Sequence, residues 1–173
     1  MIVIEKSLPG HINQYLPSLS EVLFQTVMTG ASVGFVSPFS EEKAAEFWEQ
    51  DVFPLIESGR VILFIAKVSD KVVGCVLLTL HMMPNQKHRC EVAKLLVHPS
   101  YRRKGIARKL MEALLEEAAI EAKSLITLDT RSGDAAEPLY ASLGFQVAGI
   151  IPDYAQSVEG ARLDSTTLMY LKI

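Results

Sequence analysis

The chain has 173 residues, of which 49% are hydrophobic, and its formal net charge at neutral pH is −3. This length fits one domain over residues 1–173 with a sizeable core, and the apolar content excludes a disordered chain. The slight negative charge argues against a nucleic-acid-binding protein, which is normally basic overall.

The sequence predicts neither secretion nor membrane insertion. Residues 1–5 lack the basic stretch and the apolar core of a signal peptide. The longest apolar runs, such as residues 61–66, are far too short to span a bilayer. Cys75 and Cys90 form neither a CxxC pair nor a zinc-binding spacing, and the histidines show no metal-ligand spacing. We therefore expect a cytoplasmic protein with free thiols, no metal site and no membrane partner.

Apolar periodicity in the first half of the chain predicts a strand, two helices and a β-hairpin. Ser40 has the side chain of a helix N-cap, and Gly59 follows the same helix as a terminator. In chain order, the expected elements are a strand over residues 1–6, a helix over 11–28, a helix with apolar positions from 44 to 55, and strands over 61–68 and 72–82.

The second half of the chain alternates strands and helices. The expected elements are a strand over residues 90–97, a helix over 106–123, a strand over 125–129, a short helix over 137–143, and strands over 145–151 and 166–173 with a loop over 153–164 between them. Strand–helix–strand units need parallel neighbours, whereas hairpins need antiparallel ones. The order β-α-α-β-β-β-α-β-α-β-β therefore predicts an α/β fold with a mixed sheet and helices on both faces.

The segment that leads into the helix over residues 106–123 has the features of an anion-binding loop. It reads V-H-P-S-Y-R-R-K-G-I-A from Val97 to Ala107, with Arg102, Gly105 and Ala107 in the pattern R-x-x-G-x-A. The first N–H groups of a helix have no partner within it, and the helix dipole leaves partial positive charge there. A phosphate or pyrophosphate fits this position, and Gly105 lets the backbone approach it closely.

Five basic side chains crowd the same corner. They are Arg102, Arg103, Lys104, Arg108 and Lys109. Cations oppose the dipole at the start of a helix, and such a local conflict indicates an anionic partner. The alternative is a solvated basic surface on an ordinary helix.

The order of elements and three motifs together resemble the GNAT superfamily of acyl-CoA-dependent N-acetyltransferases. The motifs are Leu95-Leu96-Val97-His98-Pro99, Arg102-x-x-Gly105-x-Ala107 and Leu139-Tyr140-x-x-x-Gly144-Phe145. The resemblance covers essentially the whole chain and is most specific from Glu91 to Phe145. It implies a mixed, mostly antiparallel sheet of six to seven strands with a splayed parallel pair at its centre.

Three further segments are similar to the tabtoxin-resistance-like branch of that superfamily. They are Gly30-Ala31-Ser32-Val33-Gly34-Phe35, Leu128-Asp129-Thr130-Arg131-x-Gly133 and Pro152-x-Tyr154-Ala155. By analogy, this narrower similarity suggests an amine-bearing antibiotic or metabolite as the acceptor.

The resemblance implies acetyl-CoA as co-substrate, held mainly by backbone groups. Arg102 would shape the loop, and the pantetheine arm would form strand-like hydrogen bonds with Leu95, Leu96 and Val97. The pyrophosphate would lie on the N–H groups of Arg103, Lys104, Gly105, Ile106, Ala107 and Arg108. Many relatives carry Asn in the segment that here reads Ser132-Gly133-Asp134, which leaves open whether Ser132 or Asp134 replaces that polar contact.

The chemistry requires a neutral amine, since an alkyl ammonium has a pKa of about 10. The resemblance implies Glu91 as general base, Asp129 as an acidic partner and Tyr140 as the general acid that protonates the leaving thiolate. A backbone N–H of Val97 or Leu96 would meet the oxyanion. The structural alternative for Tyr140 is a core aromatic residue whose hydroxyl is tied off.

The two carboxylates also have structural interpretations. Glu91 could be a solvated strand-end residue or could pair with Arg89 or Lys94. Asp129 could be a cap or turn residue paired with Arg131. The residues alone leave these alternatives open.

The sequence and the resemblance together predict direct transfer of an acetyl group from acetyl-CoA to a primary amine of a small molecule. Direct transfer is favoured because no cysteine lies in a triad-like context; Cys90 adjoins Glu91, but nothing in the sequence activates it. One alternative is a protein or peptide amine acetyltransferase, and another is a non-catalytic acyl-CoA-binding regulatory module. The expected assembly is a monomer or homodimer.

Overall fold

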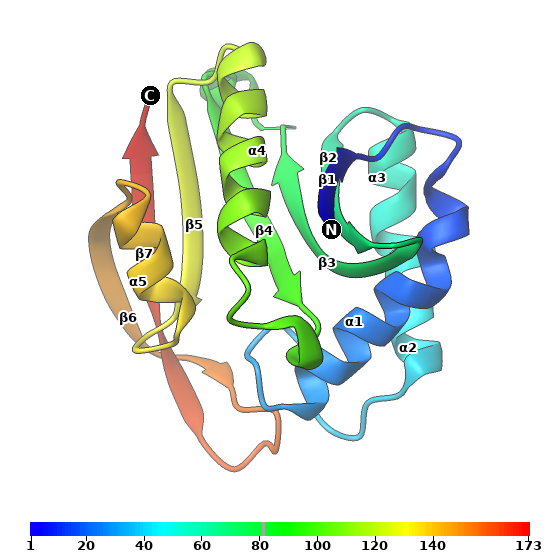
Figure 1. Ribbon diagram of the computed structural model, residues 1–173. Helices are drawn as coiled ribbons and strands as arrows, with labels where there is room; N and C mark the ends of the chain where they lie inside the picture. The colour runs from blue at the N-terminus through cyan, green and yellow to red at the C-terminus, as the bar shows by residue number, and fades with distance from the viewer. Residues whose placement is uncertain (81) are drawn as a thin grey trace.

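A computed structural model describes residues 1–80 and 82–173 and places seven strands in one sheet (Figure 1). The strands are β1 (Ile2–Lys6), β2 (Val61–Val68), β3 (Lys71–Thr79), β4 (Arg89–Val97), β5 (Leu125–Arg131), β6 (Gln146–Gln156) and β7 (Leu163–Lys172). Their order is β1-β2-β3-β4-β5-β7-β6, and every neighbouring pair is antiparallel except β4 and β5. This confirms the predicted mixed, mostly antiparallel sheet.

Helices cover both faces of the sheet, as predicted. They are α1 (Leu16–Met28), α2 (Glu41–Glu46), α3 (Phe53–Glu57), α4 (Ile106–Ile120) and α5 (Ala136–Ser142), with a π-helical segment over Phe47–Val52 and 3-10 helices over Ile12–Tyr15, Pro84–Gln86 and Pro99–Tyr101. The helices α1 to α3 share one core, in which Leu23 and Trp48 are fully buried. On the other face, α4 runs along β4 and buries Leu110 and Leu114 in a second core, which α5 completes (Figure 1).

The second predicted helix is interrupted. Ser40 caps its start, accepting a hydrogen bond from the Lys43 N–H at 3.3 Å, as predicted. The chain then passes through α2, the π-helical segment and α3 instead of forming one α-helix. Pro54 has no N–H, and its ring crowds the carbonyl four residues earlier, so a regular α-helical ladder cannot pass through it.

The last two strands are longer than predicted. β6 extends to Gln156 and β7 begins at Leu163, so the strands occupy half of the predicted loop over residues 153–164. Pro152 and Asp153, whose φ is 51°, form an irregularity after which the pairing resumes. Sequence rules read a proline here as the end of a strand, whereas a bulge accommodates it.

Two other elements end earlier in the chain than predicted. β3 ends at Thr79, short of residue 82, and His81, which lay inside that predicted strand, is outside the described residues. α4 ends at Ile120 instead of residue 123, because Ala122 turns into the left-handed conformation with a φ of 53°.

β4 and β5 pair over only a short stretch and then diverge (Figure 1). Their last pair joins Glu91 to Thr127. β4 also bulges there: Lys94 has a φ of 51°, and the register with β3 shifts between Cys75 and Leu77. The predicted splay of the central pair is present, and the bulge redirects β4 where the gap opens.

Gly74 is the point of closest approach between β3, β4 and the start of α4. A Cβ at this position would lie 2.8 Å from the Leu96 carbonyl oxygen and 3.3 Å from Ile106. We expect Gly74→Ala to lower the free energy of unfolding by about 1–3 kcal/mol, because a backbone oxygen has to move. Denaturant titration measures this, with Gly149→Ala as control, since a Cβ there meets nothing within 4 Å. Equal stability of the two variants would contradict the assignment of a tight contact.

Candidate active site

A cleft of about 980 Å³ occupies the gap between β4 and β5. Its walls come from the segment after α1, from both strands, from the loop that begins α4, from α5 and from the β6–β7 pair. Glu91, Asp129 and Tyr140, the predicted catalytic residues, all line it. Open α/β sheets bind ligands in crevices of this kind, at the carboxyl ends of parallel strands.

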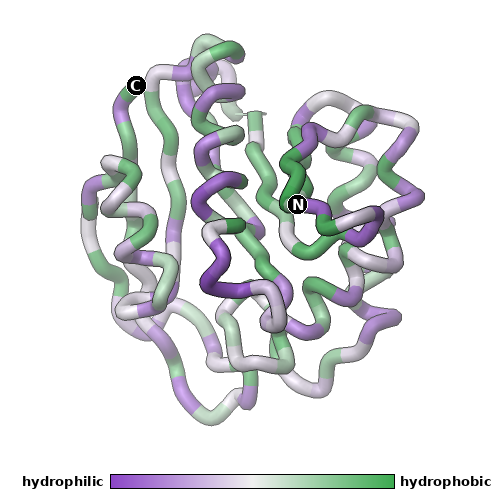
Figure 2. The backbone as a smooth tube through the Cα atoms, in the orientation of Figure 1, coloured by the Kyte–Doolittle hydropathy of each residue, from purple (hydrophilic) through white to green (hydrophobic). Residues whose placement is uncertain are grey.

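Free backbone N–H groups surround the start of α4. Gly105 is the N-cap, in the left-handed conformation with a φ of 76°, and no side chain caps the helix. Within residues 1–80 and 82–173, no acceptor meets the N–H groups of residues 103–108. A Cβ on Gly105 would meet nothing within 4 Å, so the space above the loop is open. The loop is also the hydrophilic stretch at the lower end of α4 in Figure 2. This geometry is an anion cradle.

The basic side chains of the cradle differ in what they contact and in whether they line the cleft. Arg102 shapes the loop, because its Nε donates to the Val97 carbonyl and its guanidinium donates to Thr29 Oγ1, both at 3.2 Å. Lys104 lies over the Tyr101 ring at 5.0 Å and does not line the cleft. Arg103 is exposed and lines the cleft.

Arg108 is a further basic residue of the cradle. Its guanidinium donates to Ser142 Oγ on α5 at 2.7 Å, and it also lines the cleft. The contact ties the start of α4 to α5 across the cleft.

The backbone of β4 presents Val97, not Leu96, to the gap. His98 donates its N–H to the Val73 carbonyl at 2.9 Å, and Val97 lies opposite Gly74. Backbone groups of successive strand residues point to opposite edges, so the Val97 N–H points away from β3 and into the gap. Leu96 is 1% exposed, and its side chain packs in the core. Leu95 and Val97 line the cleft.

The two carboxylates lie on the same face of the sheet. Glu91 is opposite Thr127 in the parallel pair, and Asp129 is two residues further along β5. The Glu91 side chain is 43% exposed, and its nearest cation is Arg89, at 3.5 Å. Thr166 donates its hydroxyl to Asp129 at 3.2 Å. Neither carboxylate is tightly paired in the described part of the chain, so both are available to a ligand.

The structural alternative in which Asp129 pairs with Arg131 is wrong. Arg131 pairs with Asp134 at 3.4 Å and with Asp164 at 3.7 Å instead. Asp134 lines the cleft, whereas Ser132 is engaged by Thr167 at 2.9 Å and does not line it. Of the two residues that the sequence left open as the polar contact to the cofactor, the structure brings Asp134 to the cleft.

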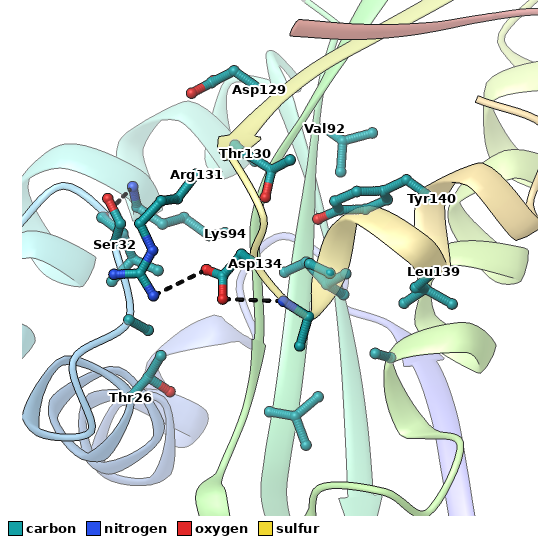
Figure 3. A pocket seen from close by; sticks show the side chains of 18 of the residues that line it. Thr26, Ser32, Val92, Lys94, Asp129, Thr130, Arg131, Asp134, Leu139 and Tyr140 are labelled. Carbon is teal, nitrogen blue, oxygen red and sulfur yellow. Dashed lines mark hydrogen bonds and ion pairs between the residues drawn. The ribbon is translucent and has the colours of Figure 1, made fainter. Parts of the chain in front are cut away.

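Tyr140 approaches the gap from α5, on the opposite face of the sheet. The residue is 6% exposed, yet its hydroxyl points into the cavity (Figure 3), and no hydrogen bond joins it to another described residue. Burial raises the pKa of Tyr140, and the carboxylates of Asp129 and Asp134 raise it further. The hydroxyl is thus a protonated donor that no described residue engages.

Lys94 is a cleft residue that sequence reasoning considered only as an ion-pair partner for Glu91. From the β4 bulge, its Nζ donates to the Val33 carbonyl at 2.9 Å and lies near the Phe35 and Phe47 rings, at 5.7 and 5.4 Å. Figure 3 shows the side chain reaching toward the segment of Ser32. No sequence signal marked it, because lysine does not favour the left-handed conformation that forms the bulge.

The remaining predicted features concern thiols and membrane spans. Cys75 and Cys90 are free and buried, and burial raises the pKa of Cys75 to about 12 and that of Cys90 to about 11. In the described ranges, no three His, Cys, Asp or Glu side chains gather as a metal-binding group. None of the described helices is long and apolar enough to cross a membrane.

The sequence profile of the Acetyltransferase (GNAT) family matches residues 24–145. Among curated proteins, the [Ribosomal protein bS18]-alanine N-acetyltransferase of Escherichia coli (strain K12) is 37% identical over 65 residues, which are 37% of this chain and 44% of that protein. The match thus spans less than half of this relative's length.

Two solved structures share the fold over nearly the whole chain. An N-acetyltransferase from Staphylococcus aureus Mu50 superposes with a TM-score of 0.80 at 16% identity, covering 99% of this chain and 98% of its own. The yncA protein of Salmonella typhimurium, a putative acetyltransferase solved with its cofactor acetyl-CoA, superposes with a TM-score of 0.78 at 21% identity, covering 99% and 93%.

Proposed function

The chain belongs to the acetyltransferase (GNAT) family, and on that premise we propose that it transfers an acetyl group from acetyl-CoA to the primary amine of a small molecule by direct attack. One observation carries the proposal: a single cleft is lined both by an uncapped helix start with free N–H groups and by two carboxylates and a tyrosine hydroxyl beside a gap in the sheet. The helix start suits binding of the acetyl donor, and the side chains suit the proton transfers.

The cradle suits the donor. The free N–H groups of residues 103–108 fit a pyrophosphate, and the open space above Gly105 leaves room for it. The Val97 N–H, which points into the gap, offers a strand-like hydrogen bond to the pantetheine arm or to the thioester oxygen.

The side chains in the gap supply the proton transfers. Glu91 takes a proton from the amine, with Asp129 orienting that group, and the amine nitrogen then bonds to the acetyl carbon. The Val97 N–H stabilises the negative charge that develops on the carbonyl oxygen. Tyr140 donates its proton to the sulfur as the carbon–sulfur bond breaks, and solvent restores that proton. The products are the acetylated amine and the free thiol.

Direct transfer is favoured over an acyl-cysteine intermediate. Cys90 precedes Glu91, but its pKa of about 11 keeps the thiol protonated near neutral pH. Cys75 has an even higher pKa and is fully buried. The unpaired thiols also support our proposal of a cytoplasmic location.

The test of this function is thiol release from acetyl-CoA with a panel of small amines. We expect release that depends on the amine, with the acetylated product identified by mass spectrometry. Binding of acetyl-CoA without transfer to any amine or peptide would instead indicate a non-catalytic acyl-CoA-binding module.

A second candidate acceptor is the N-terminal amine of a protein. The match to the bS18-alanine N-acetyltransferase over 65 residues favours it. Peptides with an N-terminal alanine distinguish the candidates: a kcat/KM higher for such peptides than for any small amine would support the second.

We also propose that the chain falls in the tabtoxin-resistance-like branch of the family. The three segments that suggest this branch contribute neighbouring walls of one cleft, through Val33, Arg131 and Tyr154. Their common position supports a shared role in selecting the acceptor.

The cradle assignment predicts a specific binding defect. Gly105→Leu is expected to raise the Kd of acetyl-CoA at least about tenfold, because the side chain would fill the space over the N–H groups and strain a backbone with positive φ. Gly59→Leu is the matched control, since Gly59 has a φ of 71° and equally open surroundings but lies outside the cleft. Calorimetry measures both, and equal affinities for the two variants would remove the cradle from the donor site.

A further inference from the structure

Lys94 places a positive charge at the wall of the cleft that the segment between α1 and α2 forms. Its Nζ donates to the Val33 carbonyl at 2.9 Å, in the segment between α1 and α2, and not to the cradle. The π-helical segment brings Phe47 to within 5.4 Å of the same Nζ. Such irregular helical turns occur frequently at functional sites.

In the described part of the chain, no carboxylate forms an ion pair with this charge. An ammonium group has three donors, and within residues 1–80 and 82–173 only the Val33 carbonyl accepts one. No described carboxylate forms an ion pair with it. Burial lowers the pKa of Lys94, and the charge of Asp129 opposes part of that lowering. A partly desolvated cation without a partner is costly.

Two other cations, one in the cleft and one beside an aromatic ring, do have carboxylate partners. Arg131, which lines the same cleft, pairs with Asp134 and Asp164. Lys67 also lies near an aromatic ring, that of Tyr15 at 6.0 Å, and pairs with a carboxylate of Glu5 at 2.7 Å. Lys94 thus lies near aromatic rings, as Lys67 does, but it lacks the carboxylate partner that Lys67 has.

We propose that the acceptor supplies this carboxylate: the substrate is a small amine that also carries a carboxylate, as an amino acid does, and Lys94 binds it. The inference rests on the proposed function, because it takes Glu91 and Asp129 as the groups that receive the amine. The cleft then presents carboxylates to the ammonium end of the acceptor and an unpaired cation to its anionic end. An amine without an anionic group would meet the unbalanced charge of Lys94, which repels its ammonium form.

The experiment compares amino acids with the amines that their decarboxylation would give, such as phenylalanine with phenethylamine and lysine with cadaverine. In the wild-type protein we expect kcat/KM to favour the carboxylate-bearing member by about 10- to 100-fold, the contribution of a hydrogen bond to a charged group. Lys94→Met keeps the length of the side chain and removes its charge. It should raise KM for the amino acid by a similar factor. It should not raise KM for the decarboxylated amine, since a repelling charge is removed, and it should leave the KM of acetyl-CoA nearly unchanged.

Lys67→Met is the control, because it removes a lysine that also faces an aromatic ring but lies outside the cleft. It should leave the preference unchanged. Turnover of the decarboxylated amines alone, or equal loss for both members in Lys94→Met, overturns the role of Lys94 and leaves the transferase in place. Bound acetyl-CoA with no turnover of any amine or peptide overturns the proposed function and the inference together.

Discussion

Replacing Tyr140 by Phe is expected to lower kcat for acetyl transfer by about 100-fold, the lower end of what a positioned proton donor contributes. The thiolate that leaves acetyl-CoA needs a proton, and the Tyr140 hydroxyl is the donor that enters the gap from the face opposite the carboxylates. The affinity for acetyl-CoA should stay within about twofold of wild type, because the cradle is untouched.

The pH dependence follows from the direction of the pKa shift. An ordinary tyrosine loses its proton near about pH 10. Burial and the nearby carboxylates raise the pKa of Tyr140 above that value, so the hydroxyl stays protonated over the whole working range. We therefore expect that Tyr140 causes no fall in wild-type kcat between about pH 8 and about pH 10. Any fall in that range should also be present in Tyr140→Phe.

Tyr170→Phe is the matched control. Tyr170 lies on β7, and its hydroxyl donates to Gln146 at 2.7 Å, outside the cleft. The two variants should behave in opposite ways: Tyr140→Phe loses turnover without losing stability, because its hydroxyl has no partner in the described structure, and Tyr170→Phe loses a little stability without losing turnover. A Tyr140→Phe enzyme with wild-type kcat would show that solvent, and not Tyr140, protonates the leaving thiolate.

The sequence predicted the parts of the fold that depend on local periodicity. The strand order around the parallel pair follows from strand–helix–strand connectivity, and the cores on the two faces follow from helical spacing such as that of Leu110 and Leu114. The errors arose where tertiary packing overrides a local rule. Pro152 predicts the end of a strand, but the residues that follow it pair with β7 again, so β6 continues.

The site was predictable where a motif carries the geometry and not where side chains meet across the chain. The cradle could be read from Arg102 and Gly105, because a helix start binds anions through its own backbone. The partners of Arg131 and the position of Lys94 depend on which segments pack against β4 and β5, and the sequence does not encode those contacts locally. The Lys94 bulge in particular has no glycine to mark it.

Replacing Glu91 by Gln is expected to lower kcat/KM by about 100-fold near neutral pH, and the deficit should shrink as the pH rises. An amine acceptor has a pKa of about 10, so near neutral pH nearly all of it carries the proton that Glu91 has to remove. At about pH 10 much of the acceptor is already neutral, and a base adds less. The pH profiles of the wild-type and variant enzymes should therefore converge at high pH.

Glu5→Gln controls for the loss of a strand carboxylate as such. Glu5 is 38% exposed, close to the 43% of Glu91, and it pairs with Lys67 between β1 and β2, at the edge of the sheet and outside the cleft. It should leave the profile unchanged. If Asp129 shares the proton transfer with Glu91, adding Asp129→Asn to Glu91→Gln should cost much less than it does alone, because residues that act as a unit are not additive. A Glu91→Gln profile parallel to that of the wild type at every pH would show that Glu91 orients the acceptor without accepting its proton.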